Sequence, residues 1–481
     1  MAAYDITKLN SSVTFDSNGP TYVISLPVDS TRTINFWYDA TSVHGSARIF
    51  QTNLSTGEVT PLGTQPDFSG SHRFNNVVPI DASHFLAFWT GAGDDGFCGV
   101  FEVNTSNWNV SKVSEYEFDT VFAWDITSVQ MSSNKFVVSW YNDAGEKKIN
   151  VFEVNTSNWN VSKVGTGTTS SDNRMSYPTI LFKIDSTHFI SFGTTGGLKA
   201  YARSWEVNLS TGAISGIGTP FGFHNDAASR KAISQIDSNR FIVFYAAFAN
   251  MEIKVIELNS TNWSFSTLST NSSTSITNAN YTSPNVVKIN SDHYLLLRGA
   301  SSSVEAQVCF VNTSNWATSL GSSLQVYNSS PSGLSLSLVK LSDAIYSSVF
   351  GISSLADAIT QTIKVEPPVV APTVTTQAVS DITKDSATGN GNITATGGAN
   401  ATRRGFCYLQ GSSGDPTTAN SVVYDDGSFG TGAYTKAITG LTPNTAYRVR
   451  AYAVNSAGTS YGSTVGFTTL KADESNFFQL F

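Results

Sequence analysis

The sequence predicts an all-β protein in two parts, a repeated domain over residues 1–366 and a smaller β domain over residues 373–470. Three observations lead to this prediction. Apolar and polar residues alternate in many short runs, and a period of two is the period of a β-strand. A motif recurs seven times at intervals of about 52 residues. Beyond Pro367 the composition changes, and all nine tryptophans lie before it.

The repeated motif consists of an apolar residue, a polar turn and a hydrophobic strand. Residues 80–89 read IDASHFLAFW, and residues 236–245 read IDSNRFIVFY. The seven copies start at residues 28, 80, 129, 184, 236, 289 and 341. A second motif follows in phase, as in residues 101–108, which read FEVNTSNW. Its Asn, Ser and Thr residues are typical of tight turns.

Each copy contains four short alternating runs, which predict four strands. A four-stranded unit repeated in this way resembles the β-propeller family, without matching a named subfamily, and implies seven blades. The last copy passes into Glu366 and Pro367 without a fourth strand. We therefore expect a strand at residues 11–16 to close the last blade.

The segment after the propeller has the composition of a hinge and then of a second β domain. Residues 367–372 form a proline-rich linker, PPVVAP. Residues 441–458 (LTPNTAYRVRAYAVNSAG) and residues 404–408 (RGFCY) resemble fibronectin type III modules of phage and bacterial surface proteins. The resemblance implies an immunoglobulin-like β-sandwich over residues 373–470. It also implies that the Tyr447 hydroxyl ties a chain corner to the backbone.

Composition excludes several classes of function. Only 13% of residues are charged, the net charge is −8, and basic residues form no cluster, so nucleic-acid binding is not expected. The sequence contains no long apolar run, so membrane insertion is not expected. The first six residues, MAAYDI, lack the pattern of a signal peptide. This predicts release by a route such as phage lysis, or a signal that has been trimmed.

The sequence predicts no catalytic residue, metal or cofactor. His84, His188 and His293 share one turn position of the repeat, where other copies have Arg or Lys. A basic residue that recurs at the same position in most blades indicates a structural role in the turn or an anion-binding rim, and not a single catalytic site. The three cysteines lack metal-ligand spacing. The pairs Asp94-Asp95 and Asp425-Asp426 are interpreted as solvated loop acids, with Ca²⁺ binding as the alternative.

Aromatic residues are the main candidates for ligand binding. Trp37, Trp89, Trp140 and Tyr245 share one position at the end of the second strand of their blades. They are candidates for stacking on glycans, and packing between blades is the alternative. The tryptophans of the second motif are expected to pack at the rim; they are Trp108, Trp159, Trp263 and Trp316.

The C-terminal tail, residues 471–481, ends in an aromatic cluster. Phe477, Phe478 and Phe481 are interpreted as a peptide that docks on another subunit, with a frayed tail as the alternative.

These features together predict a non-enzymatic virion structural or adhesion protein, such as a phage fibre, decoration or tail-associated protein. Its expected partners are other virion or surface proteins and host glycans, within a larger assembly at the virion surface. The first alternative is a secreted or cell-surface bacterial adhesin that binds glycans. A polysaccharide lyase or hydrolase built on a propeller is a further alternative.

Overall fold

The structure, a computed structural model, describes residues 4–10, 12–17, 20–39, 41–68, 70–170, 179–194, 200–224, 228–247, 250–268, 276–277, 284–300, 303–328, 331–352 and 357–472. Its regular elements in these ranges are β-strands and one 3₁₀ turn, η1 (Ala92–Asp94). The chain divides into two compact units, one over Ile6–Glu366 and one beginning at Pro367.

The described strands of the first unit form seven antiparallel sheets of four or five strands. The sheets of blades 1 to 3 are formed in turn by β3 (Pro20–Pro27), β4 (Arg32–Asp39), β5 (His44–Thr52), β6 (Val59–Leu62) and β7 (Asp67–Phe68); by β8 (Arg73–Pro79), β9 (His84–Thr90), β10 (Gly96–Asn104), β11 (Asn109–Lys112) and β12 (Tyr116–Asp119); and by β13 (Trp124–Gln130), β14 (Lys135–Tyr141), β15 (Lys147–Val154) and β16 (Val161–Ser170).

The remaining blades repeat this order. Blades 4 to 7 are formed by β17 (Ile180–Lys183), β18 (His188–Thr194), β19 (Ala200–Val207) and β20 (Ile214–His224); by β21 (Ala228–Gln235), β22 (Arg240–Ala247), β23 (Asn250–Asn259), β24 (Ser264–Thr267) and β25 (Ile276–Thr277); by β26 (Asn285–Lys288), β27 (His293–Ala300), β28 (Ser303–Val311) and β29 (Thr318–Tyr327); and by β30 (Pro331–Lys340), β31 (Ile345–Ile352), β32 (Asp357–Glu366), β1 (Asp5–Lys8) and β2 (Val13–Asp16).

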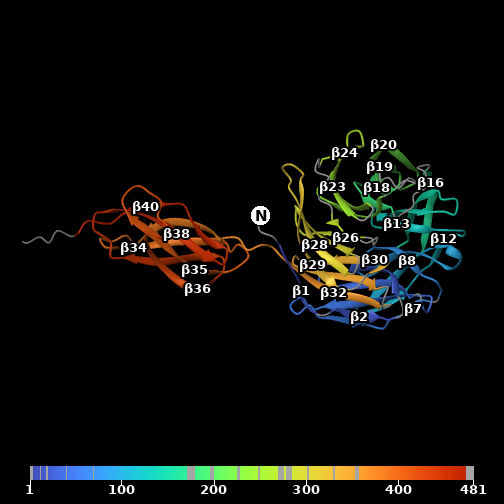
Figure 1. Ribbon diagram of the computed structural model, residues 1–481, viewed down its shortest axis with the longest axis horizontal. Helices are drawn as coiled ribbons and strands as arrows, with labels where there is room; N and C mark the ends of the chain where they lie inside the picture. Colours follow the sequence, from blue (N-terminus) through green and yellow to red (C-terminus); the bar gives the residue numbers. More distant parts are fainter. Residues whose placement is uncertain are drawn as a thin grey trace, which may run out of the picture. The chain divides into compact units, whose positions relative to one another are not determined.

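The first strand of each blade lies on the inside. β3 contacts both β30 and β8, and β8 in turn contacts β13, so the first strands of neighbouring blades lie side by side. In Figure 1 the sheets surround a common centre, with labels such as β8, β13 and β30 near the middle and β12, β16 and β20 at the periphery. This arrangement is that of a β-propeller, as the repeat predicted.

One backbone hydrogen bond marks the repeat in every blade. The N–H of Ile80 donates to the carbonyl of His84 at 2.8 Å, and Ile236 makes the same bond with Arg240. In the third blade this bond runs from Met131 to Lys135, so the third copy begins at Met131 and not at residue 129. Val129 and Met131 are both apolar and two residues apart, and a period of two does not distinguish them.

The N-terminal segment adds the outer strand of the last blade. β2 pairs with β32, with Val13 opposite Thr360 and Thr14 opposite Ile359. β1 pairs with the same strand. Because β32 and β2 come from opposite ends of the propeller sequence, this pairing closes the ring.

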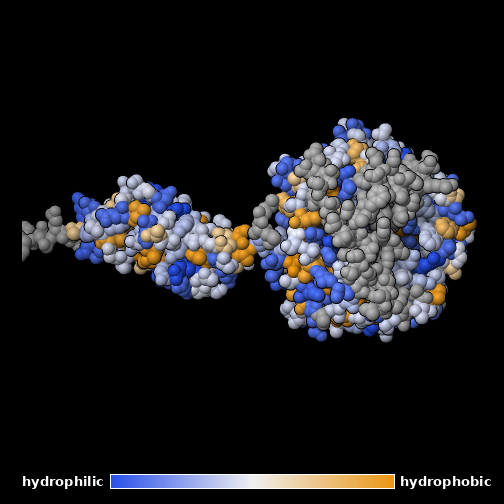
Figure 2. All heavy atoms as spheres, in the orientation of Figure 1, coloured by the Kyte–Doolittle hydropathy of each residue, from blue (hydrophilic) through white to orange (hydrophobic). Residues whose placement is uncertain are grey.

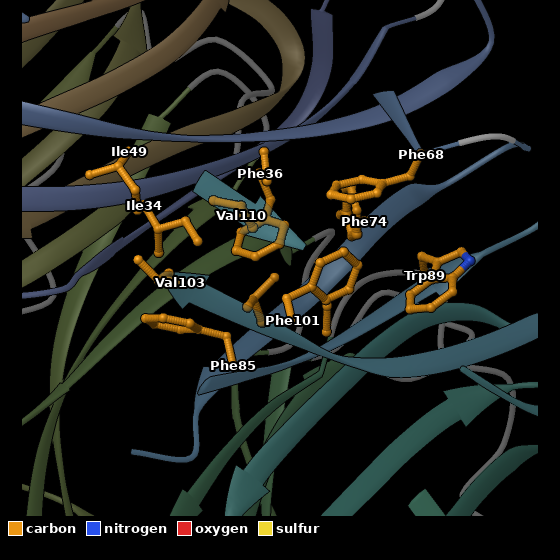
Figure 3. Close-up of a cluster of buried hydrophobic side chains, with 13 residues drawn as sticks. Ile34, Phe36, Ile49, Phe68, Phe74, Phe85, Trp89, Phe101, Val103 and Val110 are labelled. Carbon is orange, nitrogen blue, oxygen red and sulfur yellow. The ribbon is translucent and has the colours of Figure 1, made fainter. Parts of the chain in front are cut away.

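Hydrophobic clusters lie between blades. One cluster combines Ile34 and Phe36 of blade 1 with Phe85, Trp89 and Phe101 of blade 2. Figure 3 shows these side chains pointing toward one another between the two sheets. Equivalent clusters join blades 2 and 3, 3 and 4, 4 and 5, and 5 and 6. Burial of apolar surface between neighbours therefore stabilises the ring.

The second unit contains two antiparallel sheets that share one core. They are formed by β33 (Thr373–Ser380), β34 (Ser386–Ala395) and β37 (Gly432–Thr439), and by β35 (Ala401–Gln410), β36 (Ser421–Phe429), β38 (Ala446–Asn455), β39 (Gly458–Tyr461) and β40 (Val465–Thr468). Ile393 and Ile438 of one sheet belong to the same cluster as Phe406 and Val449 of the other. The Tyr447 hydroxyl accepts a hydrogen bond from the backbone N–H of Thr442 at 2.9 Å.

The visible surface is mixed in character. Figure 2 shows hydrophilic and hydrophobic residues interspersed on each unit. Within the described ranges, no helix has the length and apolar character needed to span a bilayer.

Candidate functional site

The four aromatic residues considered for glycan stacking are buried. Trp37, Trp89, Trp140 and Tyr245 expose 0, 1, 4 and 0% of their surface. A ring must present a free face to stack on a sugar, so the structure corrects this interpretation. These side chains pack between blades.

Contacts with the preceding blade hold two of these rings in place. The Trp37 indole N–H donates to the carboxylate of Asp16 on β2, and Phe15 of the same strand packs edge-on against the ring at 5.2 Å. The Trp140 indole N–H donates to Asp119 on β12 at 2.7 Å. Each indole therefore links its blade to the outer strand of the blade before it.

Trp89 and Tyr245 are enclosed by other partners. Trp89 stacks on His72 at 4.8 Å and on Phe97 at 6.0 Å, and Figure 3 shows it at one end of the cluster between blades 1 and 2. Burial lowers the pKa of His72. The Tyr245 hydroxyl donates to Glu252 at 2.6 Å.

Four of the basic turn residues stack on tryptophans of the next blade, whereas His293 lies against Phe310 of its own blade, with 4.9 Å between the ring centroids. The ring centroids of His84 and Trp159 are 3.7 Å apart, and those of His188 and Trp263 are 4.1 Å apart. Two further pairs, Arg32–Trp108 and Arg240–Trp316, have the guanidinium carbon 4.1 and 4.5 Å from the ring centre. In the third blade Lys135 instead donates to the carbonyl of Leu209 at 2.8 Å. Most of the basic turn residues, together with the tryptophans of the second motif, therefore help to hold adjacent blades together.

A small pocket lies where the inner strands of blades 1, 2 and 3 begin. Its volume is about 90 Å³. It is lined by Tyr22, Arg73, Asn75, Thr90, Trp124 and Asp125. No sequence pattern indicated this site, because the strands β3, β8 and β13 bring its residues together from three different blades.

Recurrent β-bulges direct side chains into the pocket. The pairing of β3 with β4 shifts between Thr21 and Ile24, and β8 and β13 shift at the equivalent places. Tyr22 and Asp125 have φ of 54° and 51°, a left-handed conformation that is uncommon for these residues. Bulges re-aim side chains, and backbone strain of this kind concentrates at functional sites.

Trp124 supplies a partly exposed indole at the pocket. Its surface is 39% exposed. Phe122 stacks parallel to it, with ring centroids 5.7 Å apart and an interplanar angle of 10°. The Arg73 guanidinium carbon lies 5.7 Å from the ring centre. Unlike the four buried rings, this indole is available to a ligand.

Polar contacts hold the remaining lining residues. Arg73 forms an ion pair with Asp94 and donates to the carbonyl of Gly91 at 3.3 Å. The Asn75 side chain donates to the Thr90 hydroxyl at 3.0 Å, and that hydroxyl donates to the Ala123 carbonyl at 2.7 Å. The lining is therefore organised before any ligand binds.

Tyr22 is a neutral hydrogen-bonding group at the pocket. Burial raises the pKa of its hydroxyl, and the nearby carboxylates of Asp125 and Asp94 act in the same direction, against the opposing effect of Arg73. The hydroxyl therefore keeps its proton at neutral pH. An indole face beside hydroxyl, amide, guanidinium and carboxylate groups is suited to a sugar ring, which offers apolar faces and polar edges.

The other predicted candidates do not form a reactive centre. Asp425 pairs with Lys436 and Asp426 pairs with Arg403. Across the described ranges, no group of three or more His, Cys, Asp or Glu residues is placed to hold a metal. Cys98, Cys309 and Cys407 are buried and free, and burial raises the pKa of the Cys407 thiol to about 11. Phe477, Phe478 and Phe481 lie outside the described residues.

Comparison with known proteins gives structural likeness alone. No family model and no curated protein matches the chain. The periplasmic gluconolactonase of Pseudomonas aeruginosa is similar over 67% of this chain and 89% of its own, at 12% identity and a TM-score of 0.49. A putative 6-phosphogluconolactonase from Bacteroides uniformis is similar over 62% and 83%, at 12% identity and 0.47. The SapL1 lectin in complex with alpha methyl fucoside is similar over 64% and 98%, at 8% identity and 0.41.

Proposed function

We propose that this chain is a non-enzymatic carbohydrate-binding protein whose propeller binds a sugar at the Trp124 pocket. The exposed indole of Trp124, backed by Phe122 and beside Arg73, is the observation that carries the proposal. Tyr22 and Asn75 add hydrogen-bonding groups on the same pocket wall. Binding without turnover is favoured because Arg73 and Asp94 neutralise each other.

We further propose that the protein acts in adhesion at a virion surface, with a secreted or cell-surface adhesin as the alternative. The low fraction of charged residues supports both settings. Its partners would be other virion or surface proteins and host glycans. Immunogold labelling of purified particles and of cells separates the two settings.

We infer that the second unit is a fibronectin type III-like sandwich that serves as a spacer or attachment module. Two sheets around one core support this inference, as does the bond from Thr442 to the Tyr447 hydroxyl. The fold by itself does not imply a ligand for this unit.

A glycan array with matched variants tests sugar binding. Trp124→Ala should reduce retention about tenfold or more, because an aromatic contact contributes about 1 kcal/mol beyond the area it covers. The melting temperature should stay unchanged, since the side chain is 39% exposed. Tyr424→Ala in the second unit is the control, because Tyr424 is 41% exposed and lies outside the pocket.

Two results would contradict the proposal. Retention that is equal for Trp124→Ala and the parent would exclude this pocket as the sugar site. Release of reducing ends from a polysaccharide, lost on substituting Asp94 or Asp125, would show an enzyme instead of a binding protein.

A further inference from the structure

The ion pair at the pocket wall has a consequence for the class of sugar that binds. Of the described residues that line the pocket, Arg73 is the one with a cationic side chain, and it forms an ion pair with Asp94. Asp125 also lines the pocket. Among the described residues, the charged groups at the site are therefore one cation and two carboxylates, and Asp94 compensates the charge of the cation through its contact with Nη2 of Arg73.

We infer that Asp94 is a specificity-determining residue that restricts the pocket to neutral sugars by compensating the charge of Arg73. This inference rests on the proposed function of the same site. Arginine recognises a ligand carboxylate strongly through charge-assisted hydrogen bonds, and this recognition weakens when a carboxylate of the protein already compensates the guanidinium charge. With the charge of Arg73 already compensated, an acidic sugar would face Asp125 and Asp94 without a compensating cation.

The backbone holds Asp94 in this position independently of its charge. Asp94 ends the 3₁₀ turn η1 and has a φ of 66°. The N–H of Ala123 donates to the Asp94 carbonyl at 2.8 Å, which ties η1 to the segment before β13. Asparagine adopts the left-handed conformation readily, so Asp94→Asn should keep the turn while removing the charge.

Pocket size restricts recognition to one sugar unit. A pocket of about 90 Å³ is small, so it takes one edge of a pyranose ring. The indole of Trp124 would cover a face of the same ring. A terminal residue of a glycan presents such a free edge, and an internal residue carries substituents on both sides.

The experiment compares neutral and acidic probes on matched variants. Methyl β-glucoside, methyl β-galactoside, methyl α-mannoside and methyl β-glucuronide are titrated by NMR into the full chain and into Asp94→Asn. The parent should bind at least one neutral glycoside and show no measurable affinity for the glucuronide. Asp94→Asn should gain affinity for the glucuronide by about tenfold or more, as expected for one charge-assisted hydrogen bond.

Two controls assign the gain to Arg73. Asp95→Asn removes the same charge one residue away while leaving the Arg73–Asp94 pair in place, and it should not gain affinity for the glucuronide. The double variant Arg73→Gln, Asp94→Asn should lose the gain. Melting temperatures and NMR spectra identify any variant that is not folded.

The outcomes separate this inference from the proposed function. If the parent binds glucuronide as well as the neutral glycosides, or if Asp94→Asn gains nothing while Trp124→Ala loses binding, the role of Asp94 is excluded and the sugar site stands. If no glycoside and no glycan on the array binds the parent, both proposals fail.

Discussion

At the residue scale, one position in the turn between the third and fourth strands of a blade has a left-handed backbone. Some blades have tryptophan at this position and others have glycine. Trp108 and Trp159 both have φ of 61° there, although a left-handed conformation costs a bulky residue about 1 kcal/mol. Each of these tryptophans stacks on a basic residue of the blade before it, which offsets that cost. Blades 1 and 4 have Gly57 and Gly212 at this position, with φ of 75° and 74°.

Gly212 should tolerate no side chain. A Cβ on Gly212 would lie 1.8 Å from the backbone carbonyl oxygen of Val164 in the neighbouring blade, and the positive φ adds strain. We expect Gly212→Ala to lower the free energy of unfolding by about 2 kcal/mol or more. Urea unfolding followed by tryptophan fluorescence measures this change, because every tryptophan lies in the propeller.

Gly222 provides the matched control in the same blade. A Cβ there would meet no atom within 4 Å, and its φ is not in the left-handed range. Gly222→Ala should change the free energy of unfolding by less than about 0.5 kcal/mol. Equal effects of the two substitutions would show that the turn adapts, and that the glycine is not required by its geometry.

At the scale of elements, the outer strand of the last blade depends on the N-terminal segment. Asp16 accepts the Trp37 indole N–H, and Phe15 packs on both Trp37 and Phe50. These contacts join blade 7 to blade 1, where the ring would otherwise have an open seam. An unpaired β32 would also present a free edge to other chains.

Deletion of residues 1–18 should therefore destabilise the whole propeller. It removes β1 and β2 and the aromatic contacts of Phe15. A fully buried phenylalanine contributes about 3 kcal/mol or more, and Phe15, which is partly buried, contributes part of that. Calorimetry should show a lower unfolding temperature for the propeller and an unchanged transition for the second unit.

A shorter deletion separates the effect of the strands from the effect of truncation. Removal of residues 1–4 keeps β1 (Asp5–Lys8) and β2 (Val13–Asp16). It should leave both transitions in place. A propeller that unfolds at its original temperature without residues 1–18 would show that the pairing of β2 with β32 contributes little to closure.

At the scale of the whole molecule, sequence periodicity predicted the all-β propeller because every blade packs against its neighbours in the same way. The apolar positions recur since each blade buries the same two faces against its neighbours. Periodicity did not predict the pocket, because its residues differ from blade to blade. Thr21-Tyr22, Arg73-Phe74 and Trp124-Asp125 occupy one position of the repeat, and a search for recurrence passes over residues that occur once.

The sequence also did not predict which aromatic side chains are buried and which are exposed. Trp89 and Trp124 are both aromatic residues at a strand end, one 1% exposed and the other 39% exposed. The difference comes from the partners that the fold brings against each ring, from the neighbouring strand in the case of Phe97 and from the segment before β8 in the case of His72. His72 and Phe97 both stack on Trp89, which is buried, whereas Trp124 has Phe122 and Arg73 beside its ring and stays partly exposed. Alternation assigns a residue to a face of its sheet, but it does not say what covers that face.

The second unit should fold without the propeller. Its core is a single cluster formed by residues from Val374 to Ala453, with Phe467 packed against it. The proline-rich segment 367–372 contains no strand of either unit. A fragment of residues 367–472 should therefore unfold cooperatively, at the temperature of the second transition of the full chain. Far-UV circular dichroism and calorimetry of the fragment and of the full chain measure this transition.

A fragment with no cooperative transition would contradict this prediction. It would mean that the core from Val374 to Ala453 is not sufficient for folding, and that the propeller contributes to the stability of this unit.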